Sequence, residues 1–199
     1  MTNRPPVFAS PSTPAIIHGQ LGRMALAQRL NMTRRTDLLE ALASTPADVN
    51  RLVRSLDEAA AVWRVAPDEW SCRDVVNHLR YVEPLYLARL RRVLAEDEPS
   101  VPYIHPDTMP DDPALTIAAL AEDFRLARAE TLALLRDLRP GQWQRAAIHE
   151  RKGRQTLRYL VDDLVAHDID HSHQLVEIMS WRRAFLKELA AATDRRDDR

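Results

Sequence analysis

The chain has 199 residues, enough for one domain with a full hydrophobic core and too few for two large domains. Its formal net charge of −1 argues against a general nucleic-acid binder, which carries a basic surplus or a basic face. The single cysteine, Cys72, excludes an intramolecular disulfide, and a composition with only 4 glycines favours helices over a β-rich fold.

Residues 1–33 are expected to form an N-terminal extension that is partly disordered. Residues 1–14 are rich in proline and serine and lack the apolar core of a secretory signal. A short helix is compatible with residues 16–30, and we assign no function to it. No apolar run approaches the roughly 20 residues that cross a membrane. The sequence therefore predicts a cytoplasmic protein without membrane contact.

Four long patterns with apolar residues at steps of three and four follow the extension, over residues 36–57, 71–96, 112–138 and 155–181. Pro46 lies inside the first pattern, which is therefore either one kinked helix or two helices, the second starting at this proline. Ser71 is a good N-cap for the second helix. A separate short helix is expected over 182–192. Together these patterns predict an all-α, antiparallel four-helix bundle over 34–182, followed by a C-terminal helix and charged tail over 183–199.

Three histidines occupy core-facing positions of these helices. His167 and His171 complete an apolar series in the fourth helix, at positions 157, 160, 164, 167, 171, 175 and 178. Residues four apart lie one turn above each other, so both imidazoles point into the interior. His78 occupies an equivalent position in the second helix. Three such imidazoles either are hydrogen-bonded core residues or converge on a transition metal, provided that the two helices are neighbours.

Five polar residues are candidates for the surroundings of this site: Gln174, Asp168, Asp170, His149 and Glu83. Gln174 either touches the pocket or forms a hydrogen bond between helices. Asp168 and Asp170 could orient imidazole N–H groups, and at least one of them is expected in solvent. Glu83 is expected in a salt bridge or a buried structural role. His149 either overhangs the site or belongs to a surface loop.

The same segments resemble the DinB/YfiT-like superfamily. Trp70–Leu79, with Glu83 five residues after the histidine, is similar to the family's signature in the second helix. His167–His171 followed by Gln174 is similar to its second signature, a His-x3-His-x2-Gln element. The resemblance covers about Leu38–Ile178, and two further segments match the approaches to the second and fourth helices, 63–70 and 143–157.

The resemblance implies that His78, His167 and His171 bind a divalent transition metal, with zinc or nickel expected. It implies a metal-dependent enzyme and leaves the reaction open. Because the superfamily includes thiol-dependent S-transferases, we expect chemistry of this kind on a small molecule, with a low-molecular-weight thiol as cosubstrate. A proline-rich loop over 99–113 and the loop around His149 would then shape the substrate pocket. The alternatives are a metal-dependent hydrolase, a stress-associated protein that binds metal without catalysis, and a metal-free helical interaction module. A bacterial source and a homodimer are compatible with the resemblance.

Overall fold

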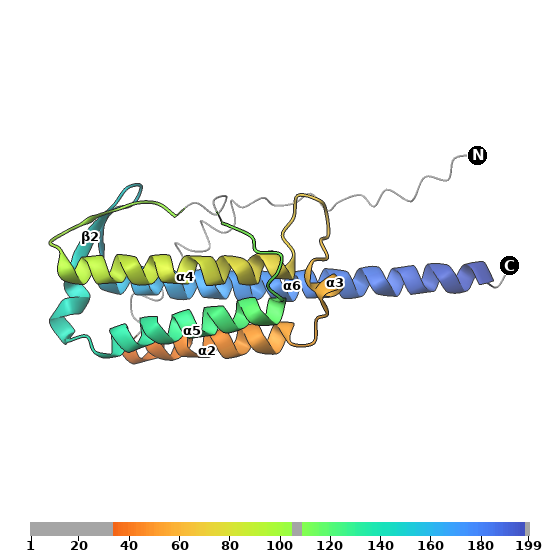
Figure 1. Ribbon diagram of the computed structural model, residues 1–199, viewed down its shortest axis with the longest axis horizontal. Coiled ribbons are helices and arrows are strands. Elements are labelled where there is room, and N and C mark those ends of the chain that lie inside the picture. The colour runs from red at the N-terminus through yellow and green to blue at the C-terminus, as the bar shows by residue number, and fades with distance from the viewer. Residues whose placement is uncertain (1–33, 105–108, 198–199) are drawn as a thin grey trace.

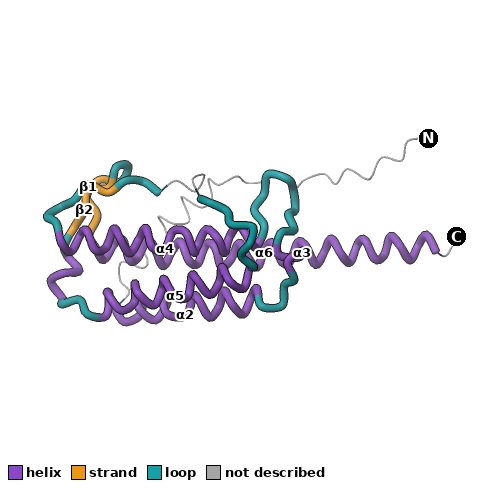
Figure 2. The backbone as a smooth tube through the Cα atoms, viewed as in Figure 1, coloured by secondary structure: helices purple, strands orange, loops and turns teal. Residues whose placement is uncertain are grey.

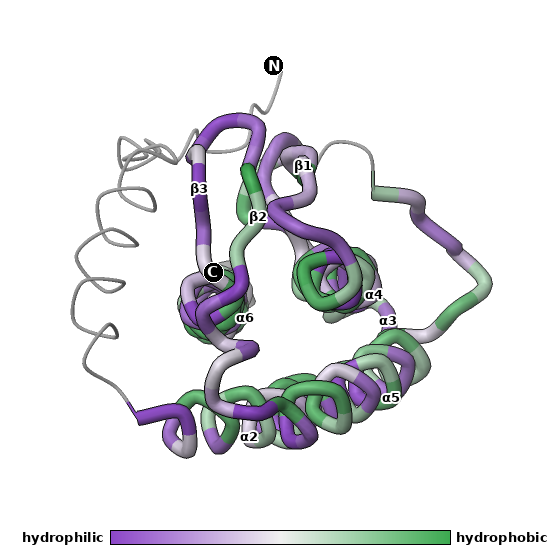
Figure 3. Tube along the Cα trace, turned by 90° about the vertical axis from the view of Figure 1, so that its left-hand side faces the viewer, coloured by the Kyte–Doolittle hydropathy of each residue, from purple (hydrophilic) through white to green (hydrophobic). Residues whose placement is uncertain are grey.

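The computed structural model describes residues 34–104 and 109–197, so the extension expected over 1–33 lies outside the described residues. Four long helices form the bundle (Figure 1), namely α2 (Arg35–Val53), α4 (Cys72–Ala95), α5 (Ile117–Arg136) and α6 (Leu157–Asp197). Viewed end-on, α2 and α5 form one layer that faces α4 and α6 (Figure 3). The predicted all-α four-helix bundle is confirmed. None of the described helices is both long and apolar enough to cross a membrane.

The connectivity of the bundle explains its long central loop. α2 and α6 run in one direction, while α4 and α5 both run in the other (Figure 1). Two parallel neighbours cannot be joined by a short hairpin, so the chain from residue 96 to residue 116 must return along the bundle. The proline-rich segment is therefore a crossover connection. It contains β1 (Ser100–Val101) at the end of the bundle where α4 ends.

Ser71 is the N-cap of α4, as the sequence predicted, and it forms a capping box with Asp74. The Ser71 side chain accepts a hydrogen bond from the backbone N–H of Asp74, and an Asp74 carboxylate oxygen accepts one from the backbone N–H of Ser71 at 2.7 Å. Both N–H groups lack partners within the helix, so the two side chains satisfy donors that would otherwise be unpaired. This fixes the start of the helix that carries His78.

α2 passes through Pro46 as one continuous helix, so the alternative of two helices is wrong. Proline has no N–H to donate to the carbonyl four residues earlier, here that of Leu42. The Nη1 atom of Arg128, on α5, donates to this oxygen at 3.1 Å. The carbonyl that the proline leaves without its helical partner is thus bonded by a neighbouring helix.

A three-stranded sheet, which the sequence analysis did not predict, lies beside α4 and α6 near one end of the bundle (Figures 2 and 3). β2 (Ala146–His149) pairs in parallel with β1 and antiparallel with β3 (Gly153–Thr156). Gly153, the first residue of β3, has φ 68°, a left-handed conformation that favours glycine directly after the turn from β2. A 3-10 helix, η2 (Pro140–Gln144), joins α5 to this sheet. The β2–β3 hairpin leads directly into α6.

α6 is a single helix of 41 residues. The expected end near residue 181 and the separate short helix over 182–192 are therefore wrong. Its sequence contains neither glycine nor proline, so nothing interrupts the hydrogen-bond pattern. The distal part projects beyond the other helices (Figure 1) and leaves large apolar side chains exposed, namely Trp181, Phe185, Leu186 and Leu189.

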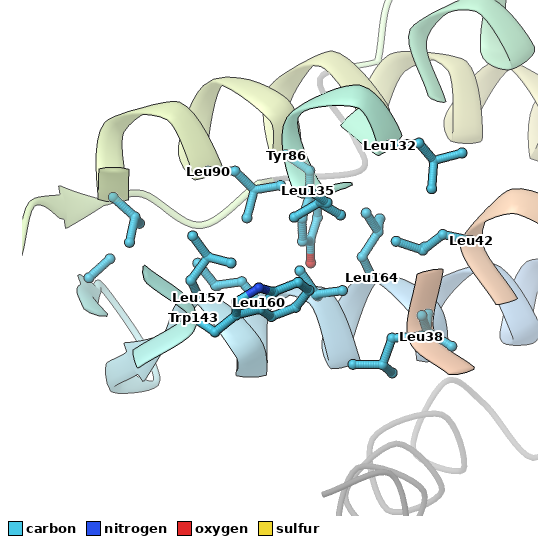
Figure 4. Close-up of a cluster of buried hydrophobic side chains, with 14 of the residues drawn as sticks. Leu38, Leu42, Tyr86, Leu90, Leu132, Leu135, Trp143, Leu157, Leu160 and Leu164 are labelled. Atoms are coloured by element: carbon cyan, nitrogen blue, oxygen red, sulfur yellow. The ribbon is translucent and has the colours of Figure 1, made fainter. Parts of the chain in front are cut away.

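Two apolar clusters fill the bundle and leave a polar layer between them. The first cluster, shown in Figure 4, joins residues such as Leu42, Tyr86, Leu135 and Leu160. The second lies around Phe124, with residues from the first turns of α4 and from the middle of α6. Polar residues lie at core-facing positions of α4, α5 and α6 near the level at which the two clusters meet. We call these residues the polar layer: His78, Glu83, Arg128, His167, Asp168 and His171.

Candidate metal centre

The structure brings the three sequence-predicted histidines together. His78 on α4 is buried, and His167 and His171 on α6 are partly buried. One ring nitrogen from each lies within 4.8 Å of those from the other two. The Nε2 atoms of His78 and His167 are 2.9 Å apart. The packing of α4 against α6 thus places three imidazoles around one point.

His171 has the protonation state that a metal ligand needs. Burial, followed by the nearby His167 and His78, lowers the pKa of His171 well below its ordinary value, so the ring is neutral at pH 7. Its Nδ1 atom lies 2.9 Å from Oε1 of Gln174. Since an amide oxygen only accepts hydrogen bonds, Nδ1 carries the proton and Nε2 keeps its lone pair for a metal.

The donor set fits a divalent transition metal. Bonds of about 2.0–2.1 Å from zinc to imidazole nitrogen place two ligands of one ion about 3.0–3.4 Å apart. The 2.9 Å between the Nε2 atoms of His78 and His167 is within a few tenths of an ångström of that range. The Nδ1 atom of His167 is buried without a hydrogen bond and lies 3.9 Å from Oδ1 of Asp168. Imidazole nitrogens suit zinc or nickel better than magnesium or calcium.

Aromatic rings lie against the histidines. The Trp70 indole stacks on His171, with ring centroids 5.9 Å apart and planes 7° apart, and lies 5.1 Å from the His78 ring. Tyr86 lies 6.5 Å from His167. Trp70 was part of the family motif, but it was not predicted as a site residue. Trp70 directly precedes the N-cap of α4, so its indole lies over the first turns of that helix.

Tyr86 remains protonated in this environment. Burial, followed by the charge of Asp163, raises the pKa of Tyr86 well above its ordinary value. Its hydroxyl donates a hydrogen bond to Oδ2 of Asp163 at 2.8 Å. The Lys152 ammonium pairs with the same carboxylate at 3.0 Å. Tyr86 therefore presents an apolar ring to the site, because its hydroxyl is hydrogen-bonded to Asp163.

Arg128 on α5 is the polar-layer residue that the sequence analysis missed. Its guanidinium binds Glu83 on α4 and Asp168 on α6, at 2.7 Å and 2.6 Å for the shortest contact to each. All three residues are at least 98% buried. The neighbouring guanidinium outweighs the effect of burial on Asp168, so the pKa of that carboxyl lies below its ordinary value. Of the two roles expected for Glu83, the structure shows the buried salt bridge.

The other sequence-predicted candidates lie as follows. Asp170 is partly buried on α6, between the two histidines of that helix in the sequence. His149 is buried at the end of β2 and is not one of the converging histidines. Its Nδ1 accepts hydrogen bonds from the backbone N–H groups of Arg151 and Lys152, so it shapes the β2–β3 turn. Burial raises the pKa of the Cys72 thiol to about 11, the opposite of what a nucleophile requires.

The end of the proline-rich crossover that leads into α5, residues 109–116, is anchored beside His78. Arg73 donates hydrogen bonds to the backbone oxygens of Leu115 and, at 2.7 Å, Asp112. Asn77, the residue before the histidine, donates to the backbone oxygen of Pro110 at 2.9 Å. The first turns of α4 therefore hold both a predicted ligand and the neighbouring loop. The residues 105–108 of this crossover lie outside the described part of the chain.

Comparisons with known proteins agree with this geometry. The sequence profile of the DinB superfamily matches residues 41–175, a range that includes all three histidines. A solved structure described as YfiT from Bacillus subtilis, a probable metal-dependent hydrolase with an unusual four-helix bundle topology, superposes with a TM-score of 0.69. The alignment covers 77% of this chain and 89% of that one at 20% identity, so it supports the fold alone. No curated protein matches the sequence significantly.

Proposed function

The chain belongs to the DinB superfamily, and we propose that it is a divalent-metal-dependent enzyme whose ion is held by His78, His167 and His171. The observation that carries this proposal is the convergence of three ring nitrogens within 4.8 Å. Three protein ligands leave coordination positions open for reactants, as in catalytic rather than structural zinc sites. Zinc or nickel is the ion we propose, with a small molecule as substrate.

The reaction we propose is transfer of a low-molecular-weight thiol to a small electrophile. A bound divalent ion would supply Lewis-acid chemistry that lowers the pKa of a thiol beside it, so that the nucleophile forms near neutral pH. Glu83 and Asp168 are both engaged by Arg128, so neither carboxylate is available to take a proton. A free thiol has a pKa of about 8.5, far below that of water, so a thiol needs less help from a base.

The chain's own residues would confine the reactants. Trp70 covers His171 and flanks His78, and so keeps bulk water from that side of the site. The segment that Asn77 anchors would form another wall. The aromatic surfaces suit an apolar part of the substrate. The thiol sulfur would bond to the electrophilic carbon, its proton would pass to solvent, and the leaving group would depart with its bonding electrons.

Hydrolysis is the second candidate, because the similar solved structure from Bacillus subtilis is described as a probable metal-dependent hydrolase. One assay separates the two. The zinc-loaded or nickel-loaded protein is given panels of electrophiles with and without mycothiol, bacillithiol or glutathione. Turnover that requires a thiol supports the transferase, whereas turnover without any thiol supports the hydrolase. Stoichiometric metal without turnover of any pair would leave a stress-associated metal-binding protein.

The exposed His173 provides a matched control for this assay. It lies on α6 two residues after His171, and its side chain is 71% exposed. His171→Ala should abolish turnover, while His173→Ala should retain it. Equal activity of the two variants would contradict the proposed site. A cytoplasmic location and a homodimer stay predictions.

A further inference from the structure

We propose that Arg128 is a positioning residue for the metal centre. Together with Glu83 and Asp168, it fixes the spacing of α4 and α6 and supplies buried negative charge that favours a cation at the three histidines. The inference rests on the proposed function, because it concerns how the same site is held. Its support comes from separate residues, none of which is a proposed ligand.

The guanidinium of Arg128 uses all of its hydrogen-bond donors. A guanidinium has five N–H groups in a fixed planar arrangement. Two of them reach Glu83, from Nε at 2.8 Å and Nη2 at 2.7 Å. Two reach Asp168, from Nη1 at 2.6 Å and Nη2 at 3.1 Å. The fifth reaches the backbone oxygen of Leu42 at 3.1 Å, so the side chain has one defined position.

These contacts join all four helices of the bundle at the level of the histidines. Arg128 belongs to α5, and its partners belong to α2, α4 and α6. Glu83 lies five residues after His78 on α4, and Asp168 directly follows His167 on α6. The network therefore contacts each ligand-bearing helix within about one and a half turns of a ligand. A shift of either helix would have to break charged hydrogen bonds inside the core.

The charges of the network do not cancel. One guanidinium faces two carboxylates, which gives a formal charge of −1 in the core, whereas the three imidazoles contribute none when neutral. In a buried setting an uncompensated charge acts strongly on its neighbours. Oδ1 of Asp168 lies 3.9 Å from Nδ1 of His167, so this negative charge adjoins a proposed ligand. A divalent ion at the histidines would more than offset it.

A purely structural role explains the network less well. Burying an ion triad is often no more stabilising than filling the same volume with apolar side chains. The bundle packs apolar clusters on both sides of the polar layer, so apolar residues would continue them. Charged residues instead occupy the part of the core in which the proposed ligands lie. Partners beyond the ligands commonly change metal affinity by about 10- to 100-fold, so such an effect can be measured.

The test uses cobalt as a spectroscopic probe. Metal-free full-length protein is titrated with Co²⁺, and the dissociation constant and visible d–d absorption are recorded for the unmodified protein and for Glu83→Gln and Asp168→Asn. Each substitution removes one negative charge with little change in size. Glu122→Gln is the matched control, because this glutamate pairs with Arg125 on the exposed face of α5.

The proposal predicts that Glu83→Gln and Asp168→Asn weaken Co²⁺ binding by about 10- to 100-fold and alter the d–d bands. Glu122→Gln should change neither. Folded variants with the unmodified affinity and spectrum would overturn the inference while leaving the metal site intact. Failure of the unmodified protein to bind Co²⁺ or Zn²⁺ would instead overturn the proposed function.

A measurement on the unmodified protein decides the matter if the two variants do not fold. The Nε–H group of Arg128 is buried and hydrogen-bonded to Glu83, so it should give a protected signal in a nitrogen–proton NMR spectrum. Because its network adjoins the site, this signal should shift on addition of an equivalent of Zn²⁺. A signal unchanged by bound Zn²⁺ would overturn the proposed coupling.

Discussion

Replacing Arg128 by methionine should destabilise the metal-free protein strongly. Methionine can still pack on Phe124, over which the guanidinium carbon lies at 5.0 Å from the ring centroid. The substitution leaves the carboxylates of Glu83 and Asp168 buried without their cation, and the backbone oxygen of Leu42 without its donor from α5. Removing one partner of a buried ion pair costs about 3–5 kcal/mol. Since one arginine serves two carboxylates, we expect a loss near 5 kcal/mol, a large part of the roughly 5–15 kcal/mol typical of a domain.

Urea unfolding of metal-free protein, followed by far-ultraviolet circular dichroism, measures this loss. Arg125→Met is the control, because Arg125 lies on the same helix and its pair with Glu122 is exposed. We expect the control to change the free energy of unfolding by no more than about 1 kcal/mol. Combining Arg128→Met with Glu83→Leu and Asp168→Leu should recover most of the stability, since no charge then remains buried. A loss below about 1 kcal/mol for Arg128→Met would refute the reasoning.

Three further predictions follow from single side chains. Burial raises the pKa of Asp162 from 3.8 to about 6. The free energy of unfolding therefore falls as the pH rises from 3.8 to about 6, because ionisation of this carboxyl is less favourable in the folded protein than in the unfolded chain. Asp162→Asn should therefore raise the free energy of unfolding at about pH 7 by roughly 1–3 kcal/mol, and this gain should shrink on acidification in urea titrations. Ser71→Ala should cost about 1 kcal/mol in the same assay, because α4 loses its N-cap; unchanged stability would contradict that assignment. Trp70→Ala should speed the removal of bound metal by a chelator, because the indole covers His171; an unchanged rate would contradict this role.

The three converging histidines could be predicted because helix geometry alone places them. Their spacing of four residues on α6, and the matching position of His78 on α4, required only regular helices that pack side by side. The capping box at Ser71 gave a sharp start to α4. The sheet was missed because its strands have two to four residues, too few for an alternating pattern to stand out. The continuity of α6 beyond residue 181 was missed although no glycine or proline interrupts it.

Arg128 was missed because the sequence analysis followed apolar residues at steps of three and four along α5, and an arginine does not belong to such a series. The apolar series along this helix runs through Ala127 and Leu134, which are only partly buried, whereas Arg128 and Leu135 are buried. Arginine is rarely buried without a partner, so its residue type alone does not predict a core position. Its partners come from two other helices, so only the tertiary packing shows that the charge is matched.

Metal content is the measurement that tests the central claim most directly. Inductively coupled plasma mass spectrometry would be applied to untagged protein, to His171→Ala and to the exposed control His173→Ala, as purified and after incubation with Zn²⁺ or Ni²⁺. The account predicts about one transition-metal ion per chain in the unmodified protein and the control, and its loss in His171→Ala. Unmodified protein that neither contains nor takes up a transition metal would contradict it, as would His171→Ala with undiminished metal.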